Sequence, residues 1–296
     1  MKTPGNWKRL VWSLRRTPGL QFRAFVCAIF VCYSVCWAVI EPALTIVSSQ
    51  DQSVTANANG WFKYLFFLAL SFVFGAAYFL WRHLPPASVS FLLDNTNTRV
   101  SVAFNDFFAE AGHKVIAVND FFDGQLGDVI SERSLHGQFI QRFLGGVAAA
   151  FYGLVDPTLP NLAAPPIVRS QGRKKAYPIG TTAVAELNST KYFFVALTTT
   201  DPTTHKVHAD VPQLWQALHG VWSKVRECAG GFSVAIPLLG GGPSGVGLPD
   251  VILLKLILAS IVQETKKCRI TDEIRIVLHP DTAEHIDLRD VVRDWS

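Results

Sequence analysis

The sequence SVAIPLLGGGPSGVGLP, residues 233–249, decides the fold of this chain. Its apolar start predicts a buried strand over residues 233–238. The glycines that follow allow the backbone to approach an anion closely, and a helix that begins near Asp250 would direct its free N–H groups to the same place. A strand, a glycine-rich loop and a helix in this order are how α/β proteins hold a diphosphate.

The residues on both sides of this stretch alternate between strand and helix patterns, which predicts an α/β sandwich with a mixed sheet. The expected strands cover residues 89–93, 98–104, 115–119, 193–198, 233–238 and 273–278. The expected helices cover residues 135–150, 211–229 and 250–266. Residues 155–175 are rich in proline and then basic, and we expect them to form an exposed loop over the sheet.

Polar and aromatic residues follow three of the expected strands. Residues 105–108 read Asn-Asp-Phe-Phe, residues 119–122 repeat these four residues, and the glycine loop covers residues 240–247. The repeat is either a pair of helix-capping turns or a set of groups that read a base and a ribose. Ligands of such sheets bind beyond the carboxyl ends of the strands. The candidate ligand-binding residues are therefore Asp106, Phe107, Asn119, Asp120, Phe121, Phe122, Gly240, Gly241, Gly242, Ser244, Gly245, Val246 and Gly247.

Hydrolysis at this site would need a base that activates a water molecule. The residues of a suitable type are Asp120, Asp123, Asp128 and His136. None of them forms a recognised dyad at this spacing, and capping of loops or of a helix start also explains them. Ser244 lies in Gly-Pro-Ser-Gly, which lacks the Gly-x-Ser-x-Gly pattern of a hydrolase nucleophile. We therefore expect no catalytic residue and a binding role rather than an enzymatic one.

The cysteines and histidines predict neither a metal centre nor a disulfide framework. Three of the five cysteines lie in an apolar run near the N-terminus, and the other two are far apart. No Cys or His pair has the spacing of a zinc site. His205 and His208 lack Cys or acidic partners, so we expect them in an exposed loop. The sequence thus predicts no metal, no cofactor and a cytosolic domain.

Two apolar runs, residues 24–47 and 61–81, are each long enough to cross the ~30 Å hydrocarbon core of a membrane. They predict a transmembrane hairpin over residues 24–83, in a chain whose mean hydropathy is positive. Glu41, which a proline follows, either lies near the outer interface or lines a pore or a helix contact in an oligomer. The small residues at 75–77 offer a surface where another helix could pack closely.

Residues 1–23 are basic and contain no acid, which predicts a short amphipathic helix at the inner face of a membrane. Because basic residues flanking a span stay in the cytoplasm, we expect both termini there. The short polar segment between the spans would then be an external turn. Residues 88–296 form the expected ligand-binding domain. With a net charge of only +4, the chain is not expected to bind nucleic acid.

The soluble part resembles the macro domain, an ADP-ribose-binding fold with three α/β/α layers. By this resemblance Asp106 would accept a hydrogen bond from the adenine amino group, and Asn119 would lie near the distal ribose. Residues 240–247 match the second phosphate loop, and residues 121–137 take the place of the first. The family's usual Asn-Ala-Ala-Asn is Asn-Asp-Phe-Phe here, which implies a pocket reshaped for a modified ADP-ribose rather than hydrolase chemistry.

Two N-terminal membrane helices followed by such a domain are similar to the effectors of type II Thoeris, a bacterial anti-phage system. The resemblance implies a TIR-domain partner that makes an ADP-ribose-derived signal from NAD, expected to be histidine–ADP-ribose. Binding of the signal would promote a homo-oligomer that disrupts the lipid of the inner membrane and causes abortive infection. A membrane-anchored ADP-ribosyl hydrolase is the alternative, and a constitutive structural anchor is a third possibility.

Overall fold

The computed structural model describes residues 18–48, 60–83, 85–94, 96–161, 166–242 and 245–295. The chain divides into two compact units, a helical hairpin that ends at Pro85 and a domain that continues from Pro86 to the C-terminus. Most of the expected amphipathic segment at residues 1–23 lies outside the described residues, as do the external turn at 49–59 and the side chain of Glu41.

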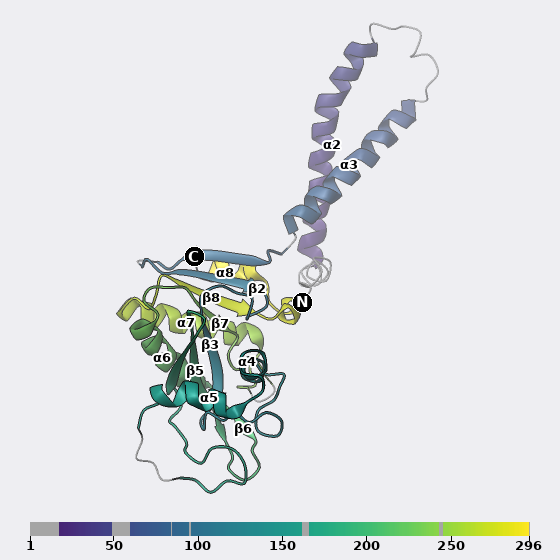
Figure 1. Ribbon diagram of the computed structural model, residues 1–296. Helices are drawn as coiled ribbons and strands as arrows, with labels where there is room; N and C mark the ends of the chain where they lie inside the picture. The colour runs from purple at the N-terminus through teal and green to yellow at the C-terminus, as the bar shows by residue number, and fades with distance from the viewer. Residues whose placement is uncertain are drawn as a thin grey trace. The chain divides into compact units, whose positions relative to one another are not determined.

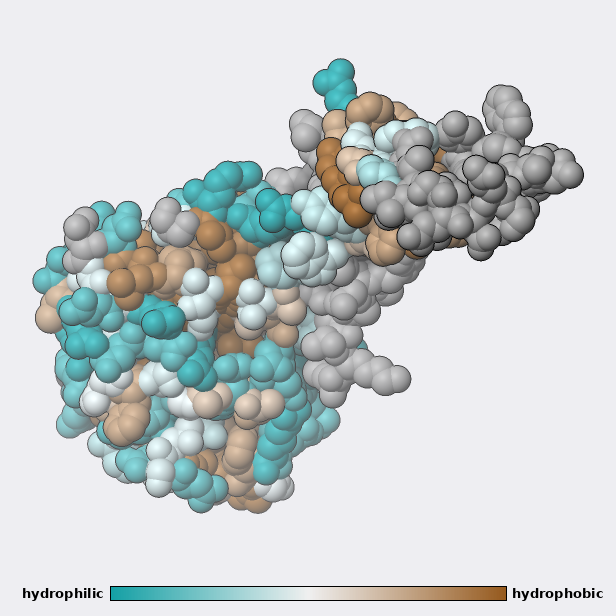
Figure 2. Space-filling view, turned by 90° about the horizontal axis from the view of Figure 1, so that it is seen from above, coloured by the Kyte–Doolittle hydropathy of each residue, from teal (hydrophilic) through white to brown (hydrophobic). Residues whose placement is uncertain are grey.

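The hairpin consists of α2 (Pro18–Ser48) and α3 (Gly60–His83). Each helix is long and apolar enough to cross a membrane, by length and composition, with windows at Phe22–Val39 and Leu65–Arg82. Only 6% and 22% of these windows are buried, whereas a core helix of a soluble protein is mostly buried. In the view of Figure 2 hydrophobic residues are part of the visible surface of the hairpin, while the surface of the domain is mostly hydrophilic.

The two helices of the hairpin pack closely through small residues. A Cβ atom at Gly75 would lie 2.8 Å from the Cα atom of Ile29, so only glycine allows this approach. Ala28 and Ser71 are also buried in the hairpin. The expected helix-packing surface at residues 75–77 is thus partly occupied by α2 of the same chain, although Ala77 is exposed.

The domain is built on one mixed sheet with the strand order β1-β2-β8-β7-β3-β5-β4 (Figure 1). The strands are β1 (Ser88–Leu92), β2 (Arg99–Phe104), β3 (His113–Asn119), β4 (Thr182–Leu187), β5 (Thr190–Thr200), β7 (Val234–Pro237) and β8 (Glu273–Leu278). The short β6 (Val207–His208) pairs with β5. The inner five strands are parallel, and β1 and β4 are antiparallel edges.

Helices cover both faces of this sheet. One face packs against α4 (Leu135–Leu144) and α5 (Ala148–Val155), and the other against α6 (Val211–Cys228), α7 (Asp250–Lys267) and α8 (Leu288–Trp295). Two short 3-10 segments, Asp156–Thr158 and Pro280–Glu284, follow α5 and β8. Alternate residues along the strands supply the two hydrophobic cores, as with Val115 on one face and Ile116 on the other. The predicted α/β sandwich is confirmed.

Several elements differ from the sequence prediction, and β6 and α8 have no counterpart among the expected strands and helices. The helix expected at 135–150 is divided at Gly145 and Gly146, whose φ angles are 60° and 81°. This left-handed backbone ends α4 with an amide that donates to the carbonyl of Ile140. The antiparallel edge β4 has no counterpart among the expected strands, because its sequence TAVAEL is rich in alanine, a residue that strands disfavour.

Candidate functional site

The structure brings the three predicted ligand-binding segments to one edge of the sheet. The strands β2, β8, β7, β3 and β5 are neighbours and run in the same direction, so their carboxyl ends share one edge. Asp106 follows β2, the glycine loop follows β7, and Asn119 ends β3. The loop therefore lies between the other two segments along this edge, as a ligand spanning all three would require.

The glycine loop turns back on itself in a way that depends on its glycines. Val246 N donates to the carbonyl of Gly240 at 3.0 Å, and Gly245 N donates to the carbonyl of Gly242 at 2.8 Å. A Cβ atom at Gly245 would overlap the carbonyl oxygen of Gly240. The φ angles of Gly240 and Gly247 are 81° and 74°, in the region that favours glycine. Ser244 lies outside the described residues.

The loop leads directly into α7, which begins at Asp250 after the N-cap residue Pro249. No side chain of the described residues caps this helix start, which leaves its first N–H groups available to an anion. Gly241 and Gly242 are exposed, so their backbone is also accessible. The carboxylate of Asp250 lies in the first turn, however, and it weakens the positive field there.

Asp106 keeps about a third of its side chain exposed while it caps the following turn. Its Oδ1 accepts a hydrogen bond from the backbone N–H of Phe108 at 3.0 Å. Its Oδ2 lies 4.0 Å from Nη1 of Arg142, with side-chain exposures of 32% for the acid and 46% for the base. Phe107 is buried beneath it in the core. Asp106 is thus both a capping residue and an accessible acceptor.

Residues 119–122 are buried, unlike Asp106. Asn119 donates through Nδ2 to Oδ2 of Asp123 at 2.8 Å, and its Oδ1 accepts the backbone N–H of Asp123 at 3.0 Å. Asp120 accepts the backbone N–H of Thr200 at 3.0 Å, which joins the ends of β3 and β5. The rings of Phe121 and Phe122 are almost completely buried. In this structure the polar side chains of the segment bond to the backbone of their own turn and of the end of β5.

Burial also changes the acidity of Asp120. Removal from water raises the pKa of this carboxyl above its ordinary value, while the hydrogen bonds from Thr200 and the charge of Arg169 act in the opposite direction. Its neighbour Phe122 adopts a φ of 52°, and its ring packs edge-to-face on Tyr177 with centroids 5.4 Å apart. The turn after β3 is therefore a strained and tightly packed feature of the domain.

Arg169 is a residue of this site that the sequence interpretation missed. Its buried guanidinium donates through Nη1 to Oδ2 of Asp123 at 3.0 Å and to the carbonyl of Arg173 at 2.8 Å. It also stacks over the ring of Phe121, 3.9 Å from the centroid. The expectation of an exposed loop at 155–175 is wrong at Arg169. Asp123 is itself buried, and a buried charge needs a partner, which Arg169 supplies.

The segment around Arg169 is hydrogen-bonded to the turn before β6. His205, with a φ of 57°, has Nδ1 at 3.4 Å from Nη2 of Arg169 and Nε2 at 3.0 Å from Oγ of Ser170. His205 is half-buried rather than part of an exposed loop, whereas His208 is exposed, as expected. Among the described residues no group of three or more His, Cys, Asp or Glu side chains could hold a metal ion.

His136, a candidate base, is buried at the start of α4. Its ring lies 4.7 Å from the ring of Phe151, and burial lowers its pKa to about 3. Among the described residues, its Nε2 atom meets no hydrogen-bond partner. In this structure His136 is a neutral imidazole that packs among aromatic rings in the core.

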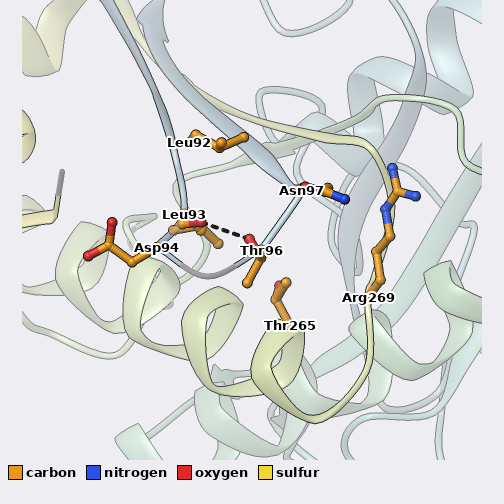
Figure 3. Close-up of a pocket in the computed structure, with 7 residues that line it drawn as sticks. All are labelled: Leu92, Leu93, Asp94, Thr96, Asn97, Thr265 and Arg269. Carbon is orange, nitrogen blue, oxygen red and sulfur yellow. Dashed lines mark hydrogen bonds between the residues drawn. The ribbon is translucent and has the colours of Figure 1, made fainter.

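A hollow of about 550 Å³ lies at the opposite edge of the sheet, beside the turn between β1 and β2 (Figure 3). Asp94 points away from Asn97 and Arg269 in this view, so the charged groups of the hollow do not converge on one point. The lining residues are Leu92, Leu93, Asp94, Thr96, Asn97, Thr265 and Arg269. The hollow lies near the amino ends of β2 and β8, whereas the candidate ligand-binding site lies at the carboxyl ends of the strands.

Comparisons with known proteins show which proteins this chain is similar to. Residues 100–279 match the family model described as Thoeris protein ThsA, Macro domain. Thoeris protein ThsA of Bacillus amyloliquefaciens (strain Y2) is 25% identical over 206 residues, which cover 66% of this chain and 67% of that protein. The Oceanobacillus iheyensis macrodomain with ADP is 12% identical, covers 70% of this chain and 98% of its own, and has a TM-score of 0.41. The same macrodomain with MES bound is also 12% identical. That match covers 70% of this chain and 98% of the macrodomain chain, with a TM-score of 0.42.

Proposed function

Because the match extends over more than half of the chain, this protein belongs to the Thoeris ThsA macro-domain family, and we propose that it is a membrane effector of bacterial anti-phage defence. Its domain binds an ADP-ribose-type ligand, with histidine–ADP-ribose as the expected form. A TIR-domain protein produces this signal from NAD. Binding promotes a homo-oligomer whose hairpins disrupt the inner membrane and lead to cell death.

The glycine loop is the observation that carries this proposal. It places exposed glycine backbone and an uncapped helix start at one edge of the sheet, between Asp106 and Asn119. A diphosphate at the loop would let an adenosine extend toward β2 and a distal ribose extend toward β3. The loop supplies affinity through backbone N–H groups, and Asp106 supplies an acceptor for the base.

The hairpin supports the membrane part of the proposal. Both helices expose apolar side chains such as Phe30, Val39 and Phe74 along their length, which water disfavours and lipid accepts. We place the chain in the inner membrane with both termini in the cytoplasm, where the signal is made. To shift an assembly from 1:99 to 99:1, ligand binding must favour the assembled state by about 5.5 kcal/mol, which several coupled subunits can supply together.

We favour a receptor over a hydrolase because two candidate bases are already engaged and a third is buried and neutral. Asp120 accepts a backbone N–H, Asp123 is paired with Arg169, and burial keeps His136 neutral. Asp128 is exposed, outside this buried network. A hydrolase needs a base that holds a water molecule near the distal ribose, and these contacts would have to break first.

The test is calorimetric titration of the full-length chain in detergent micelles with ADP-ribose, histidine–ADP-ribose and NAD, followed by product analysis of the same samples. Tight binding of one ligand without turnover is the expected result. Turnover of an ADP-ribosyl substrate would replace the receptor with the membrane-anchored hydrolase. Failure to bind any of the three ligands would overturn the assignment of the glycine loop.

A further inference from the structure

The first strand of the domain, β1, is an open edge of the sheet (Figure 1). In the described part of the chain it has β2 as its one neighbour in the sheet order. Leu93 N donates to the carbonyl of Thr98, and Phe104 N donates to the carbonyl of Ala87. Hydrogen-bonded residue pairs alternate along an antiparallel ladder. The backbone N–H and C=O groups of the odd-numbered residues of β1 therefore point toward β2. By the same alternation the N–H and C=O groups of Ser88, Ser90 and Leu92 point away from the sheet.

Within the described residues, the opposite edge, β4, is protected in two ways that β1 is not. The outward N–H of Val184 donates to Oγ1 of Thr158 at 2.9 Å, so the segment after α5 covers that edge. Glu186 adds an exposed charged residue to β4. Charges, prolines and covering segments are the usual devices that prevent sheets from pairing edge to edge. The sequence of β1, SVSFL, contains no charge and no proline.

We propose that β1 is the surface through which two copies of this chain join, as antiparallel strands that continue the sheet from one copy into the other. The register that pairs all of these outward backbone groups is the one we propose. Ser90 of one copy lies opposite Ser90 of the second, and Ser88 lies opposite Leu92. All three residues are exposed in the single chain, with Leu92 56% exposed. The pairing gives every outward N–H and C=O of the strand a partner.

The membrane hairpin strengthens this contact by raising the local concentration of the chains. A few newly paired residues form a weak interface in free solution, since short strand pairs are marginally stable in water. The strand, however, begins directly after the short linker that follows α3. Chains held in one membrane meet at a raised local concentration, which strengthens a weak contact without new interactions. The surface thus suits a second membrane-bound copy better than a free protein.

This inference extends the proposed function by naming the surface of the homo-oligomer, yet it depends on strand geometry and not on the ligand. The matched test is cysteine crosslinking of the full-length chain in native membranes, in a background whose five cysteines are replaced by alanine. Directly opposed, hydrogen-bonded residues have Cα atoms about 5.5 Å apart, which a disulfide can bridge. Ser90→Cys should form a disulfide-linked dimer. Glu186→Cys, on the protected edge, is the control and should remain monomeric.

Equal crosslinking of the two variants, or none at Ser90, would overturn the proposed surface. Each measurement is made with and without ADP-ribose. A Ser90 crosslink that forms without ligand still supports the β1 contact, even if the calorimetric titration shows no binding. The outcome for the surface is thus separate from the outcome for the ligand.

A second pair of variants tests the contact without cysteines. Ser90→Lys places two like charges directly opposite each other across the proposed two-fold axis, which opposes pairing. Ser90→Thr keeps a hydroxyl and raises strand propensity. In energy transfer between donor- and acceptor-labelled full-length chains in lipid vesicles, Ser90→Lys should lower the transfer that reports paired copies, and Ser90→Thr should not. Unchanged transfer for Ser90→Lys would contradict the inference.

Discussion

At the scale of single residues, the pair formed by Asp123 and Arg169 determines the shape of the candidate site. Both side chains are fully buried, and Arg173 adds its backbone N–H to the other oxygen of Asp123 at 2.6 Å. Gly172 makes this possible, because a Cβ atom there would lie 2.5 Å from the same carboxylate. The cluster holds the turn after β3 in place, and it covers the ring of Phe121.

Removal of one partner should therefore be costly. Arg169→Leu leaves the carboxylate of Asp123 buried without its counter-ion, and we expect a loss of about 3–5 kcal/mol in the free energy of unfolding. Urea denaturation measures this. Asp156→Asn, which removes the half-exposed partner of Arg173, is the control and should cost less than about 1 kcal/mol. Similar losses for the two variants would show that the buried pair has no special role.

Gly245 gives a direct test of the phosphate loop. Gly245→Val places a side chain against the carbonyl of Gly240, so the loop must open and its N–H groups turn away from an anion. We expect loss of ADP-ribose binding, at least about 100-fold, since several charge-assisted hydrogen bonds disappear together. Gly153→Ala, with open space around it, is the control. Unchanged affinity of the Gly245 variant in calorimetry would exclude the loop as the anion site.

His136 predicts a dependence of stability on pH. Burial holds its pKa at about 3 in the folded chain, whereas the unfolded chain takes up a proton near 6.5. The unfolded state therefore binds more protons below pH 6.5, and the free energy of unfolding should fall as the pH drops, by up to about 1.4 kcal/mol per pH unit.

His136→Phe should flatten this dependence because its ring cannot take up a proton. Urea denaturation at about pH 7.5 and about pH 5 measures the difference. His208→Gln, at an exposed position, should leave the slope as it is. Parallel slopes for the parent and His136→Phe would contradict the assignment of the buried neutral ring.

At the scale of secondary-structure elements, hydrophobic patterning predicted most of the sheet. The predicted strand at 273–278 and the predicted helix start at 211 agree with β8 and α6, because buried runs between clear turn residues leave little choice of boundary. The gathering of Asp106, the glycine loop and Asn119 at one edge also followed from the sequence, because each lies at the carboxyl end of an expected strand. The contact of Arg169 with Asp123 did not, because the pair joins residues 46 positions apart in a segment without periodicity.

Hydrophobic patterning did not predict the break between α4 and α5, which depends on the left-handed backbone of Gly145. Gly145 has a φ of 60°, and a Cβ atom added there would meet no other atom within 4 Å. Gly145→Ala should therefore destabilise the fold only through the strain of a left-handed backbone, without a steric clash. We expect a loss of about 1–2 kcal/mol in the free energy of unfolding. Gly153→Ala lies within α5 in open space and should instead gain up to about 1 kcal/mol. Changes of the same sign in denaturant unfolding would contradict this account.

At the scale of the whole molecule, the two units have separable roles in the proposed function. Gly75→Leu pushes α2 and α3 apart at Ile29 without touching the domain. We expect the full-length variant to bind ADP-ribose normally and to lose ligand-dependent leakage of dye from vesicles. Ala77→Leu, on an exposed position of α3, is the control and should retain leakage. Leakage by the Gly75 variant at the parent level would show that the close packing of α2 and α3 is dispensable.

The edge position of β1 has a mechanical consequence. This strand follows the linker from α3 and is held in the sheet by five residue pairs with β2. Tension applied through the linker acts on these pairs before it reaches the strands that follow β1 along the chain. Membrane bending or lateral pressure on the hairpin would then reach the domain first at β1, and optical-trap pulling from the N-terminal side should detach this strand at low force before the parallel strands respond.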